Sequence, residues 1–599
     1  MASWVSPVCL VLLLAAASPV QPPARSLPRT PVPGTASISG IVLTDDTDAR
    51  PLRRVRVFLN SPDDEVARTT ISDDAGRFVF DGLRAGRYTV GGTKEGYVTV
   101  NYGARRSGRA GAPITLADGQ ALADLILTLP RGAVITGVLL DPDGLPIPGV
   151  SMRALRYVYT ATGERRLAAV STTMASHITD DRGAYRIYGL PAGEYAIAAP
   201  ATLPPGDNVL LMSDTVVRAA LDELKQSQRQ QTTPNAEASA GSRTDADGPR
   251  AIGYAPVFYP STTVATEAAV IPLGKSEERA DIDVQLQYVP IATIRGSVIG
   301  SEGVSPESIR VNLIGTSDVI LSSNGSETRT TSVTAKGEFS FANVPPGAYT
   351  LIAKGTRGPF VGAPIVWATT ELVVEGQSEA EVALLLQPGL TVSGRVGFEG
   401  RTPPPDPSRV RVRLLPVLSA GQVSLGTAPA VVDAAGRFTI TGITAAKYRV
   451  QANISGPSGW MLATSVVSGR DVLDTPLDLR QSVDGAVVTF TDRPGELSGV
   501  VRDSSGKPIA AHTVSLFAAE RSLWTPGSRR IRAVPSATDG TFLFRMVPPG
   551  EYWIAAVADV DDGEWYDPVL LEHLATSSAV KTTILEGGKK TLDVRIPSP

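Results

Sequence analysis

The 599-residue sequence has one cysteine, Cys9, and only three histidines. With its single thiol near the N-terminus, the body of the chain has no disulfide framework and no thiolate nucleophile. The histidines, His177, His512 and His573, lie in three different parts of the chain, and none has a glutamate at ligand spacing on a helix. A zinc peptidase centre needs clustered His and Glu ligands, so we predict no metal-binding residues.

Motifs of catalysis and cofactor binding are also missing. There is no Gly-x-Ser-x-Gly elbow, no Walker loop and no dinucleotide-binding fingerprint, so we expect no enzyme, no cofactor and no catalytic residues. Two acidic runs, 141–144 (DPDG) and 559–564 (DVDDGE), offer oxygen ligands for Ca²⁺ but lack EF-hand spacing, and solvated turns are the favoured interpretation. The net charge of −4 gives no basic field for nucleic acid.

The N-terminus has the features of an export signal. Residues 8–17 form an apolar run too short to span a bilayer, and the small residues at 15–18 offer a cleavage site. We predict a signal peptide over 1–20, followed by a Pro-rich linker over 21–35. No later run is long and apolar enough for a membrane helix, so the expected location is extracellular, periplasmic or on the cell surface.

One pattern recurs along the rest of the chain, and residues 179–195 (TDDRGAYRIYGLPAGEY) show it best. Asp180 and Gly183 fit the first and fourth positions of a type I turn. Alternating apolar residues then predict a strand, a tight Pro/Gly connection and a second strand that begins at Tyr195, which we interpret as a hairpin. The turn glycine and the tyrosine are twelve residues apart in five places: Gly76 and Tyr88, Gly183 and Tyr195, Gly337 and Tyr349, Gly436 and Tyr448, Gly540 and Tyr552.

A glycine inside the first strand opens each copy, at Gly40, Gly137, Gly296, Gly394 and Gly499. Such a glycine indicates a bulge or a close backbone approach. The period of about one hundred residues, with about seven short strands, is typical of a Greek-key sandwich. We therefore predict an all-β chain of five tandem seven-stranded, immunoglobulin-like β-sandwich domains. We call these domains repeats 1 to 5, with boundaries at 36–130, 131–290, 291–388, 389–494 and 495–599.

Repeat 2 is longer than the others and carries an insertion over 207–251. Within it, residues 214–231 place Val217, Leu221 and Leu224 at helical spacing, which predicts one short helix. Residues 232–250 are polar and aperiodic, which is typical of a flexible loop. The repeats join through Pro-containing segments with almost no linker, for example 129–132 (LPRG), and this predicts a stiff rod.

The opening Gly, the D-x-x-G-x-F/Y turn, the G-L-P-A-G-x-Y connection and the closing strand resemble the carboxypeptidase regulatory-like (transthyretin-like or prealbumin-like) domain. The resemblance covers essentially all of 36–597, and 137–149 and 189–195 match best. Repeat 4 departs from the pattern, with 444–447 (TAAK) in place of the Pro/Gly turn, and repeat 1 has Arg84 in place of Pro. The resemblance implies a non-catalytic, prealbumin-like sandwich of the carbohydrate-binding-like group, in tandem arrays secreted by bacteria.

Aromatic residues that follow the motif or lie in loops are the candidate ligand-binding set: Trp460, Trp565, Tyr566, Phe258, Tyr259 and Trp524. An exposed Trp or Tyr face stacks well on a sugar ring. Trp460, Trp565 and Trp524 lie in turn-rich contexts and are the best candidates for exposure. The alternative is that these aromatics fill the sandwich cores.

These features leave several functions open. The first is an exported, non-catalytic multidomain binding protein, with carbohydrate as the leading ligand class and polysaccharide or cell-envelope components as partners. The second is a structural role as a stalk or spacer. A third is an accessory string of domains for an outer-membrane transporter or a secreted peptidase.

Overall fold

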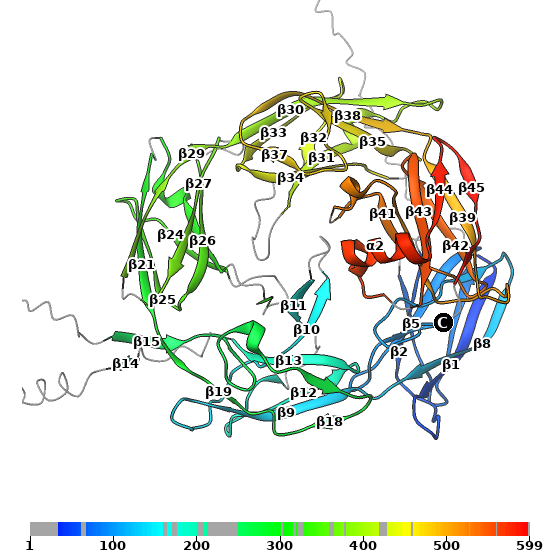
Figure 1. Cartoon of the computed structure of the whole chain (residues 1–599), viewed down its shortest axis with the longest axis horizontal. Helices are drawn as coiled ribbons and strands as arrows, with labels where there is room; N and C mark the ends of the chain where they lie inside the picture. Colours follow the sequence, from blue (N-terminus) through cyan, green and yellow to red (C-terminus); the bar gives the residue numbers. More distant parts are fainter. Residues whose placement is uncertain are drawn as a thin grey trace, which may run out of the picture.

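The computed structural model describes residues 34–61, 67–159, 165–170, 177–200, 209–211, 250–300, 303–315, 319–320, 328–358, 364–376, 379–417, 428–456, 459–525, 527–558 and 560–596. These residues form an all-β protein in which the five repeats follow one another around a ring (Figure 1). The predicted all-β sandwich fold class is confirmed. The signal peptide, most of the Pro-rich linker and residues 214–231 of the insertion lie outside the described residues.

The strands of the first two repeats are as follows. Repeat 1 contains β1 (Ala36–Thr44), β2 (Arg56–Asn60), β3 (Arg68–Ile71), β4 (Arg77–Leu83), β5 (Gly86–Thr93), β6 (Val100–Asn101), β7 (Ile114–Leu116) and β8 (Ala121–Leu129). Repeat 2 contains β9 (Ala133–Leu140), β10 (Arg153–Tyr159), β11 (Arg165–Ala169), β12 (Ala184–Leu190), β13 (Gly193–Ala199), β14 (Val209–Leu211), β15 (Arg250–Tyr254), β16 (Val257–Phe258), β17 (Ile271–Leu273), β18 (Glu278–Arg279), β19 (Val284–Gln285) and β20 (Tyr288–Pro290).

The last three repeats continue the series. Repeat 3 contains β21 (Ala292–Ile299), β22 (Arg310–Gly315), β23 (Val319–Ile320), β24 (Thr328–Ser332), β25 (Glu338–Val344), β26 (Gly347–Thr356), β27 (Ile365–Val374), β28 (Glu379–Leu385) and β29 (Gln387–Pro388). Repeat 4 contains β30 (Leu390–Glu399), β31 (Val410–Pro416), β32 (Ala430–Val431), β33 (Arg437–Ile443), β34 (Ala446–Ile454), β35 (Met461–Val467), β36 (Arg470–Asp471), β37 (Leu477–Leu479) and β38 (Val483–Thr491). Repeat 5 contains β39 (Gly495–Arg502), β40 (Thr513–Ala518), β41 (Ile531–Pro535), β42 (Thr541–Val547), β43 (Gly550–Val557), β44 (Val580–Ile584), β45 (Lys589–Thr591) and β46 (Val594–Arg595).

Helices are short and few in the described residues. Helix α2 (Pro568–Ser577) lies in repeat 5, and the 3₁₀ turns are η2 (Ala265–Glu267), η3 (Pro306–Ser308), η4 (Pro407–Arg409), η5 (Arg521–Leu523) and η6 (Glu564–Tyr566). The sequence analysis missed α2, although its start carries a signal: the Asp567 carboxylate caps the helix by accepting from the Val569 N–H, and Pro568 takes the first turn.

All five repeats share one strand order. The opening strand lies between the first motif strand, which is antiparallel to it, and the closing strand, which is parallel, as in β4-β1-β8 and β25-β21-β28. The second sheet contains the second motif strand, as in β3-β2-β5-β6. A separate cluster of buried apolar side chains fills the space between the two sheets of each repeat. Each repeat thus has a buried apolar cluster of its own.

Four of the five opening glycines are explained by a close backbone approach, as predicted, whereas at Gly296 an added Cβ would meet the Phe339 ring. A Cβ added at Gly40 would lie 2.1 Å from the carbonyl oxygen of Leu125 on the closing strand. The same contact would be 2.0 Å at Gly137, against the carbonyl oxygen of Ile282. Any side chain at these positions would therefore separate the opening strand from the closing strand.

The motif is a link between the two sheets, and its interpretation as a hairpin was wrong. In repeat 2, β12 pairs with β9 in one sheet, whereas β13 pairs with β10 in the other. The predicted type I turn before β12 is present, because the Gly183 N–H donates to the Asp180 carbonyl at 3.0 Å and Gly183 has φ of +70°. Where the chain crosses between sheets, the Tyr195 hydroxyl donates to the carbonyl of Pro191 at 2.6 Å.

The same tyrosine bond occurs in every repeat. Each hydroxyl donates to the carbonyl four residues earlier, from Tyr88 to Arg84, Tyr349 to Pro345, Tyr448 to Thr444 and Tyr552 to Pro548, at 2.7–3.0 Å. This arrangement resembles the tyrosine corner of other β-sandwiches. The bond fixes the crossing between sheets, which explains why the turn glycine and the tyrosine keep one spacing in all five copies.

The ends of the predicted insertion are strands. β14 pairs with β15, and β15 pairs with β20, so a small three-stranded sheet begins and ends the segment that we predicted to be helix and loop. Tyr254 on β15 and Tyr288 on β20 are directly opposite, with ring centroids 5.3 Å apart.

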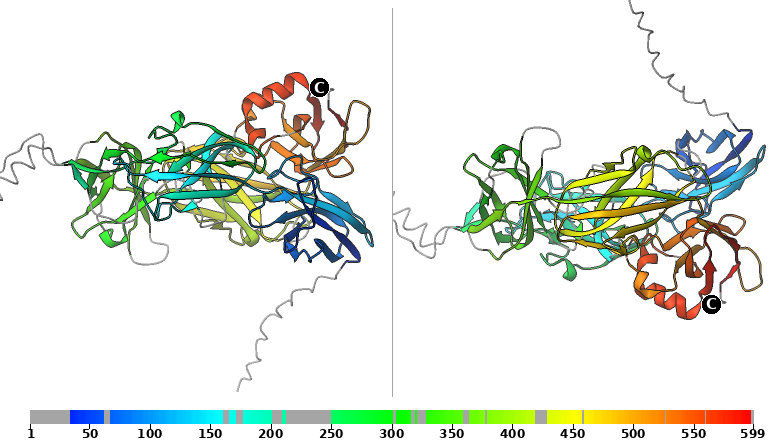
Figure 2. Two further views of the ribbon diagram at one scale, coloured as in Figure 1. Left: turned by 90° about the horizontal axis from the view of Figure 1, so that it is seen from below. Right: turned by 90° about the horizontal axis from the view of Figure 1, so that it is seen from above.

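The repeats form a ring, so the prediction of a stiff rod was wrong. Repeat 1, in blue, lies beside repeat 5, in orange to red (Figure 1). The side views of Figure 2 show these two repeats displaced in opposite directions along the ring axis. Short joints do restrict the angle between neighbouring repeats, but that angle turns the chain in one direction and brings its two ends together.

Candidate functional sites at the interfaces between repeats

The structure buries half of the predicted ligand-binding aromatics. Trp460, Trp524 and Phe258 are only 8%, 9% and 3% exposed. Trp460 packs edge-on against Phe398, with centroids 5.4 Å apart, and the Trp524 indole N–H donates to the Ala518 carbonyl at 2.7 Å. The expected exposure of Trp460 and Trp524 was therefore wrong, and core filling accounts for all three buried residues.

The other three predicted residues are half-buried. Tyr259 packs against the core of repeat 2. Trp565 and Tyr566 lie on η6 and pack against a small apolar cluster beneath α2. The six aromatics lie in repeats 2, 4 and 5, and the structure does not bring them together as one binding face.

Repeats 1 and 5 are in direct contact, although they are farthest apart in sequence. The Arg105 guanidinium (Nη1) lies 2.7 Å from Nε2 of His512, and Arg109 forms an ion pair with Asp561. A backbone bond joins the N–H of Thr538 to the carbonyl of Pro113 at 3.0 Å. These contacts close the ring, and we call them the closing contact.

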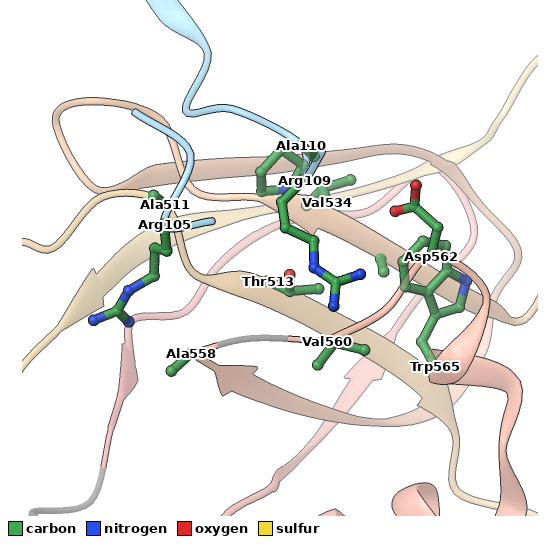
Figure 3. A pocket seen from close by; sticks show the side chains of 12 residues that line it. Arg105, Arg109, Ala110, Ala511, Thr513, Val534, Ala558, Val560, Asp562 and Trp565 are labelled. Atoms are coloured by element: carbon green, nitrogen blue, oxygen red, sulfur yellow. The ribbon is translucent and has the colours of Figure 1, made fainter. Parts of the chain in front are cut away.

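A small cavity of about 70 Å³ lies at the closing contact (Figure 3). Arg105 and Arg109 reach into it from repeat 1, and Asp562 and Trp565 line it from repeat 5. Trp565 is thus a predicted aromatic that contributes to a cavity between repeats. The space is too small for a sugar ring, since ligand pockets usually measure about 300–1,000 Å³.

The hydrogen bonds of His512 define its protonation. Its Nδ1 lies 2.9 Å from the Ala510 carbonyl, which only accepts, so Nδ1 carries a hydrogen. The Arg105 guanidinium only donates, so Nε2 must accept and the ring must be neutral. Burial lowers the pKa of His512, and the positive charge of Arg105 adds to this effect. The closing contact therefore requires the neutral form of His512.

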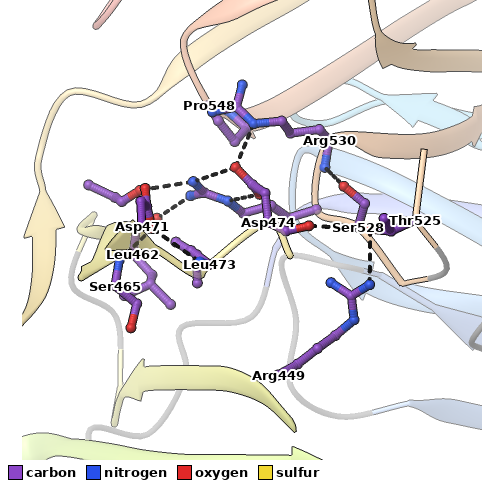
Figure 4. Close-up of polar contacts among 12 residues, drawn as sticks. Arg449, Leu462, Ser465, Asp471, Leu473, Asp474, Thr525, Ser528, Arg530 and Pro548 are labelled. Carbon is purple, nitrogen blue, oxygen red and sulfur yellow. Dashed lines mark hydrogen bonds and ion pairs between the residues drawn. The ribbon is translucent and has the colours of Figure 1, made fainter. Parts of the chain in front are cut away.

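A buried carboxylate joins repeats 4 and 5 (Figure 4). Asp474 of repeat 4 is 9% exposed and accepts from Arg529 Nε at 2.7 Å and Arg530 Nε at 2.6 Å, both from repeat 5. Arg529 also donates to the carbonyls of Leu462 and Ala463 at 2.7 and 2.8 Å. Nε, Nη1 and Nη2 of Arg529 and Nε of Arg530 thus have acceptors on the neighbouring repeat.

Electrostatics favour the charged form of Asp474. Burial by itself would raise the pKa of this carboxyl, but the hydrogen bonds and charges of Arg529 and Arg530 outweigh it and lower the pKa. Arg530 also donates to the Tyr552 hydroxyl at 3.2 Å and to the Pro549 carbonyl at 2.9 Å. The interface is therefore connected to the tyrosine corner of repeat 5.

The remaining neighbours also touch. Between repeats 1 and 2, the N–H of Gly132 donates to the Gly96 carbonyl at 2.9 Å and the Tyr188 hydroxyl donates to Glu95 at 3.0 Å. Between repeats 2 and 3, β11 pairs in parallel with β23. Sequence reasoning did not find the interfaces between repeats. Arg529 and Arg530, for example, lie in a polar loop, and such arginines are typical of any solvated turn.

No metal site appears among the described residues, where no three His, Cys, Asp or Glu side chains cluster. The carboxylate of Asp141 caps its own turn, accepting from the N–H groups of Asp143 and Leu145 at 2.9 and 2.7 Å. In the part of the chain that the structure describes, no helix is both long and apolar enough to cross a membrane.

Fold and interfaces together define a multidomain protein of tandem β-sandwiches. Residues 37–130, nearly all of repeat 1, match the family model of the carboxypeptidase regulatory-like domain. Repeat 1 is therefore a carboxypeptidase regulatory-like domain. No curated protein sequence matches the chain.

Solved structures similar to this chain include three pilins. A streptococcal ancillary pilin has 14% identity and a TM-score of 0.18, over 51% of this chain and 99% of the pilin. The minor pilin of Streptococcus agalactiae has 11% identity and a TM-score of 0.20, over 43% and 97%. The major pilin subunit of Bacillus cereus has 11% identity and a TM-score of 0.15, over 78% and 99%.

Proposed function

We propose that this protein is an exported, non-catalytic scaffold whose five sandwich repeats close into a ring and bind carbohydrate of the cell envelope or its surroundings. The observation that carries the structural part is the closing contact, in which repeat 5 meets repeat 1 through Arg105 and His512. A chain that served only as a stalk would have no use for such a contact. The carbohydrate part is supported by the fold group that the sequence resembles.

Export is supported by the apolar run at 8–17, with small residues after it. In a bacterial host, the full chain is expected outside the cytoplasm, and a chain without residues 1–20 is expected to stay inside. Equal distribution of both chains between the cell fractions would refute export.

The ligand class is tested by a glycan array and by pulldown with insoluble polysaccharides, using residues 21–599. We expect binding to at least one neutral glycan, and no binding to any of them would refute the ligand class. The alternative function, as an accessory to an outer-membrane transporter or a secreted peptidase, predicts co-purification with such a protein in place of glycan binding.

A further inference from the structure

We propose that a neutral oligosaccharide segment binds in the pocket between repeats 3 and 4, with Trp367 at its wall. The pocket measures about 340 Å³ and is lined from repeat 3 by Thr350, Ile352, Trp367, Thr369, Thr370 and Glu371. From repeat 4 it is lined by residues 444–446. Its volume lies at the lower end of the range for ligand pockets and suits a chain of one or two sugar rings.

The strand register puts the polar lining on one face of a sheet. Opposite one another on β26 and β27 are Thr350 and Glu371, and then Ile352 and Thr369. Alternate residues of a strand point to opposite faces, and the intervening Leu351 and Ala353 belong to the core of repeat 3. Thr350, Ile352, Trp367, Thr369 and Glu371 therefore occupy the outer face of that sheet, away from the core. Thr370, opposite Leu351, belongs to the other face.

Three side chains on this outer face are nevertheless buried. Thr350, Ile352 and Trp367 are 4%, 5% and 5% exposed. Residues 444–446 of repeat 4 line the same pocket from the other side. The joint between the two repeats holds the two walls together, because the Gly389 N–H donates to the carbonyl of Ile365 on β27 at 2.8 Å.

One polar atom at the wall has no partner in the described residues. The indole Nε1 of Trp367 is buried and has no hydrogen-bond acceptor there. Leaving a buried donor unsatisfied has a free-energy cost, and most buried polar groups are satisfied. The indole nitrogens of buried tryptophans usually find an acceptor, as Trp524 does in repeat 5. A ligand oxygen that reaches Trp367 would recover this cost.

The chemistry of the wall selects the class of ligand. The lining offers threonine hydroxyls, one carboxylate and one indole, together with the apolar surfaces of Ile352, Ala445 and Ala446. Hydroxyls and carboxylates exchange hydrogen bonds with sugar hydroxyls, and apolar and aromatic surfaces pack against sugar rings. Among the described residues that line the pocket there is no lysine or arginine, and the Glu371 carboxylate disfavours an anionic ligand.

The wall on repeat 4 is where this repeat departs from the motif. The connection between sheets has the sequence ITAA at 443–446, whereas at the equivalent positions repeats 3 and 5 have VPPG and repeat 2 has LPAG. Small alanines leave room for the pocket, and the Thr444 hydroxyl is held 2.8 Å from the Tyr448 hydroxyl of the tyrosine corner. The departure therefore places a fixed hydroxyl and two small side chains opposite Trp367.

This inference deepens the proposed function and rests on it for the class of ligand. It does not depend on the closing contact, which lies between other repeats. The test is isothermal titration of the chain 21–599 with cellotriose, maltotriose, xylotriose and chitotriose. Trp367→Phe removes the indole N–H, Glu371→Gln removes the carboxylate at an exposed position, and Ala445→Leu fills the pocket. Trp460→Phe makes the same aromatic change in the core of repeat 4 and serves as the matched control.

We expect at least one trisaccharide to bind, with about a tenfold or greater loss of affinity in each pocket variant and an unchanged affinity in Trp460→Phe. Binding that all three pocket variants leave unchanged would overturn the site but keep the proposed ligand class. If no trisaccharide binds, the site is overturned. If the glycan array also shows no binding, the proposed ligand class is overturned as well. Glu371→Gln and Ala445→Leu alter partly or fully exposed side chains, so they test the site even if Trp367→Phe fails to fold.

Discussion

The Arg105 guanidinium of repeat 1 lies 2.7 Å from Nε2 of His512 in repeat 5, although 407 residues separate them in the chain. Such a contact requires that every joint between repeats turn the chain in a compatible direction. The ion pair of Arg109 with Asp561 and the backbone bond between Thr538 and Pro113 lie at the same interface. Three different kinds of contact thus connect the first repeat to the last.

The closing contact is expected to weaken in mild acid. The folded pKa of His512 is lowered, so the unfolded chain binds more protons and stability rises with pH through this group. The contribution of His512 is complete above its unfolded pKa of about 6.5 and is lost as pH falls through the lower folded pKa. Protonation would also put a cation against Arg105.

Small-angle scattering between pH 8 and pH 5 measures this effect as an increase in the radius of gyration at the acidic end. His512→Gln keeps a neutral side chain that can accept from Arg105, so this variant should show a much flatter pH profile. The same pH-dependent expansion in His512→Gln would show that another group is responsible.

The interface between repeats 4 and 5 should depend on Asp474. Asp474→Asn removes a buried charge and leaves Arg529 and Arg530 without their carboxylate, which typically costs about 3–5 kcal/mol. Denaturant unfolding should give a lower midpoint for repeats 4 and 5. Asp478→Asn on β37 removes a carboxylate from an exposed ion pair and should cost under about 1 kcal/mol. Equal effects of the two variants would contradict the account of this interface.

The contribution of each tyrosine corner to the stability of its repeat should follow the burial of its tyrosine. Tyr448 is fully buried, so Tyr448→Ala should cost its repeat about 3–5 kcal/mol, as for other large-to-small core changes. Tyr448→Phe loses only the hydroxyl bonds at Thr444 and should cost about 0.5–1.5 kcal/mol. Tyr349 is half-buried, and Tyr349→Ala should cost less. A loss below about 1 kcal/mol for Tyr448→Ala would contradict a structural role of the corner.

The opening glycines should tolerate no side chain. In Gly137→Ala the new Cβ would lie 2.0 Å from a backbone carbonyl oxygen, so the opening and closing strands must separate, and we expect a loss above about 3 kcal/mol. Gly144→Ala is the matched control, since no atom lies within 4 Å of its Cβ and only its positive φ of +83° is strained. This control should lose about 1–2 kcal/mol. Thermal unfolding of the two variants would reveal a difference, and similar values would contradict the close approach.

Local patterns predicted the repeat well. Alternation located the motif strands β12 and β13, and the D-x-x-G signature located the turn at Gly183. The sequence could not tell a hairpin from a crossing between sheets, because both need two alternating runs and a tight connection. Only the pairing of β12 with β9 and of β13 with β10 distinguishes them.

Sequence patterns could not predict how the repeats are arranged relative to one another. Whether the repeats form a ring or a rod depends on the angle at each joint. That angle is set by contacts such as the one between Asp474 and Arg529. Turn-rich surroundings suggested that Trp460 is exposed, but packing against Phe398 buries it. The pocket at Trp367 was not predicted, because its lining comes from two different repeats.

Ring closure is tested most directly by the distance between repeats 1 and 5 in solution. Thr115 and Thr538 are both exposed, and they lie on the two sides of the closing contact. Spin labels on cysteines at these positions, in the chain 21–599 that has no other cysteine, report this distance by pulsed electron resonance. The ring predicts one short distance, no longer than the two label linkers allow. A broad distribution of long distances, with repeats 2 to 4 extended between the labels, would contradict it.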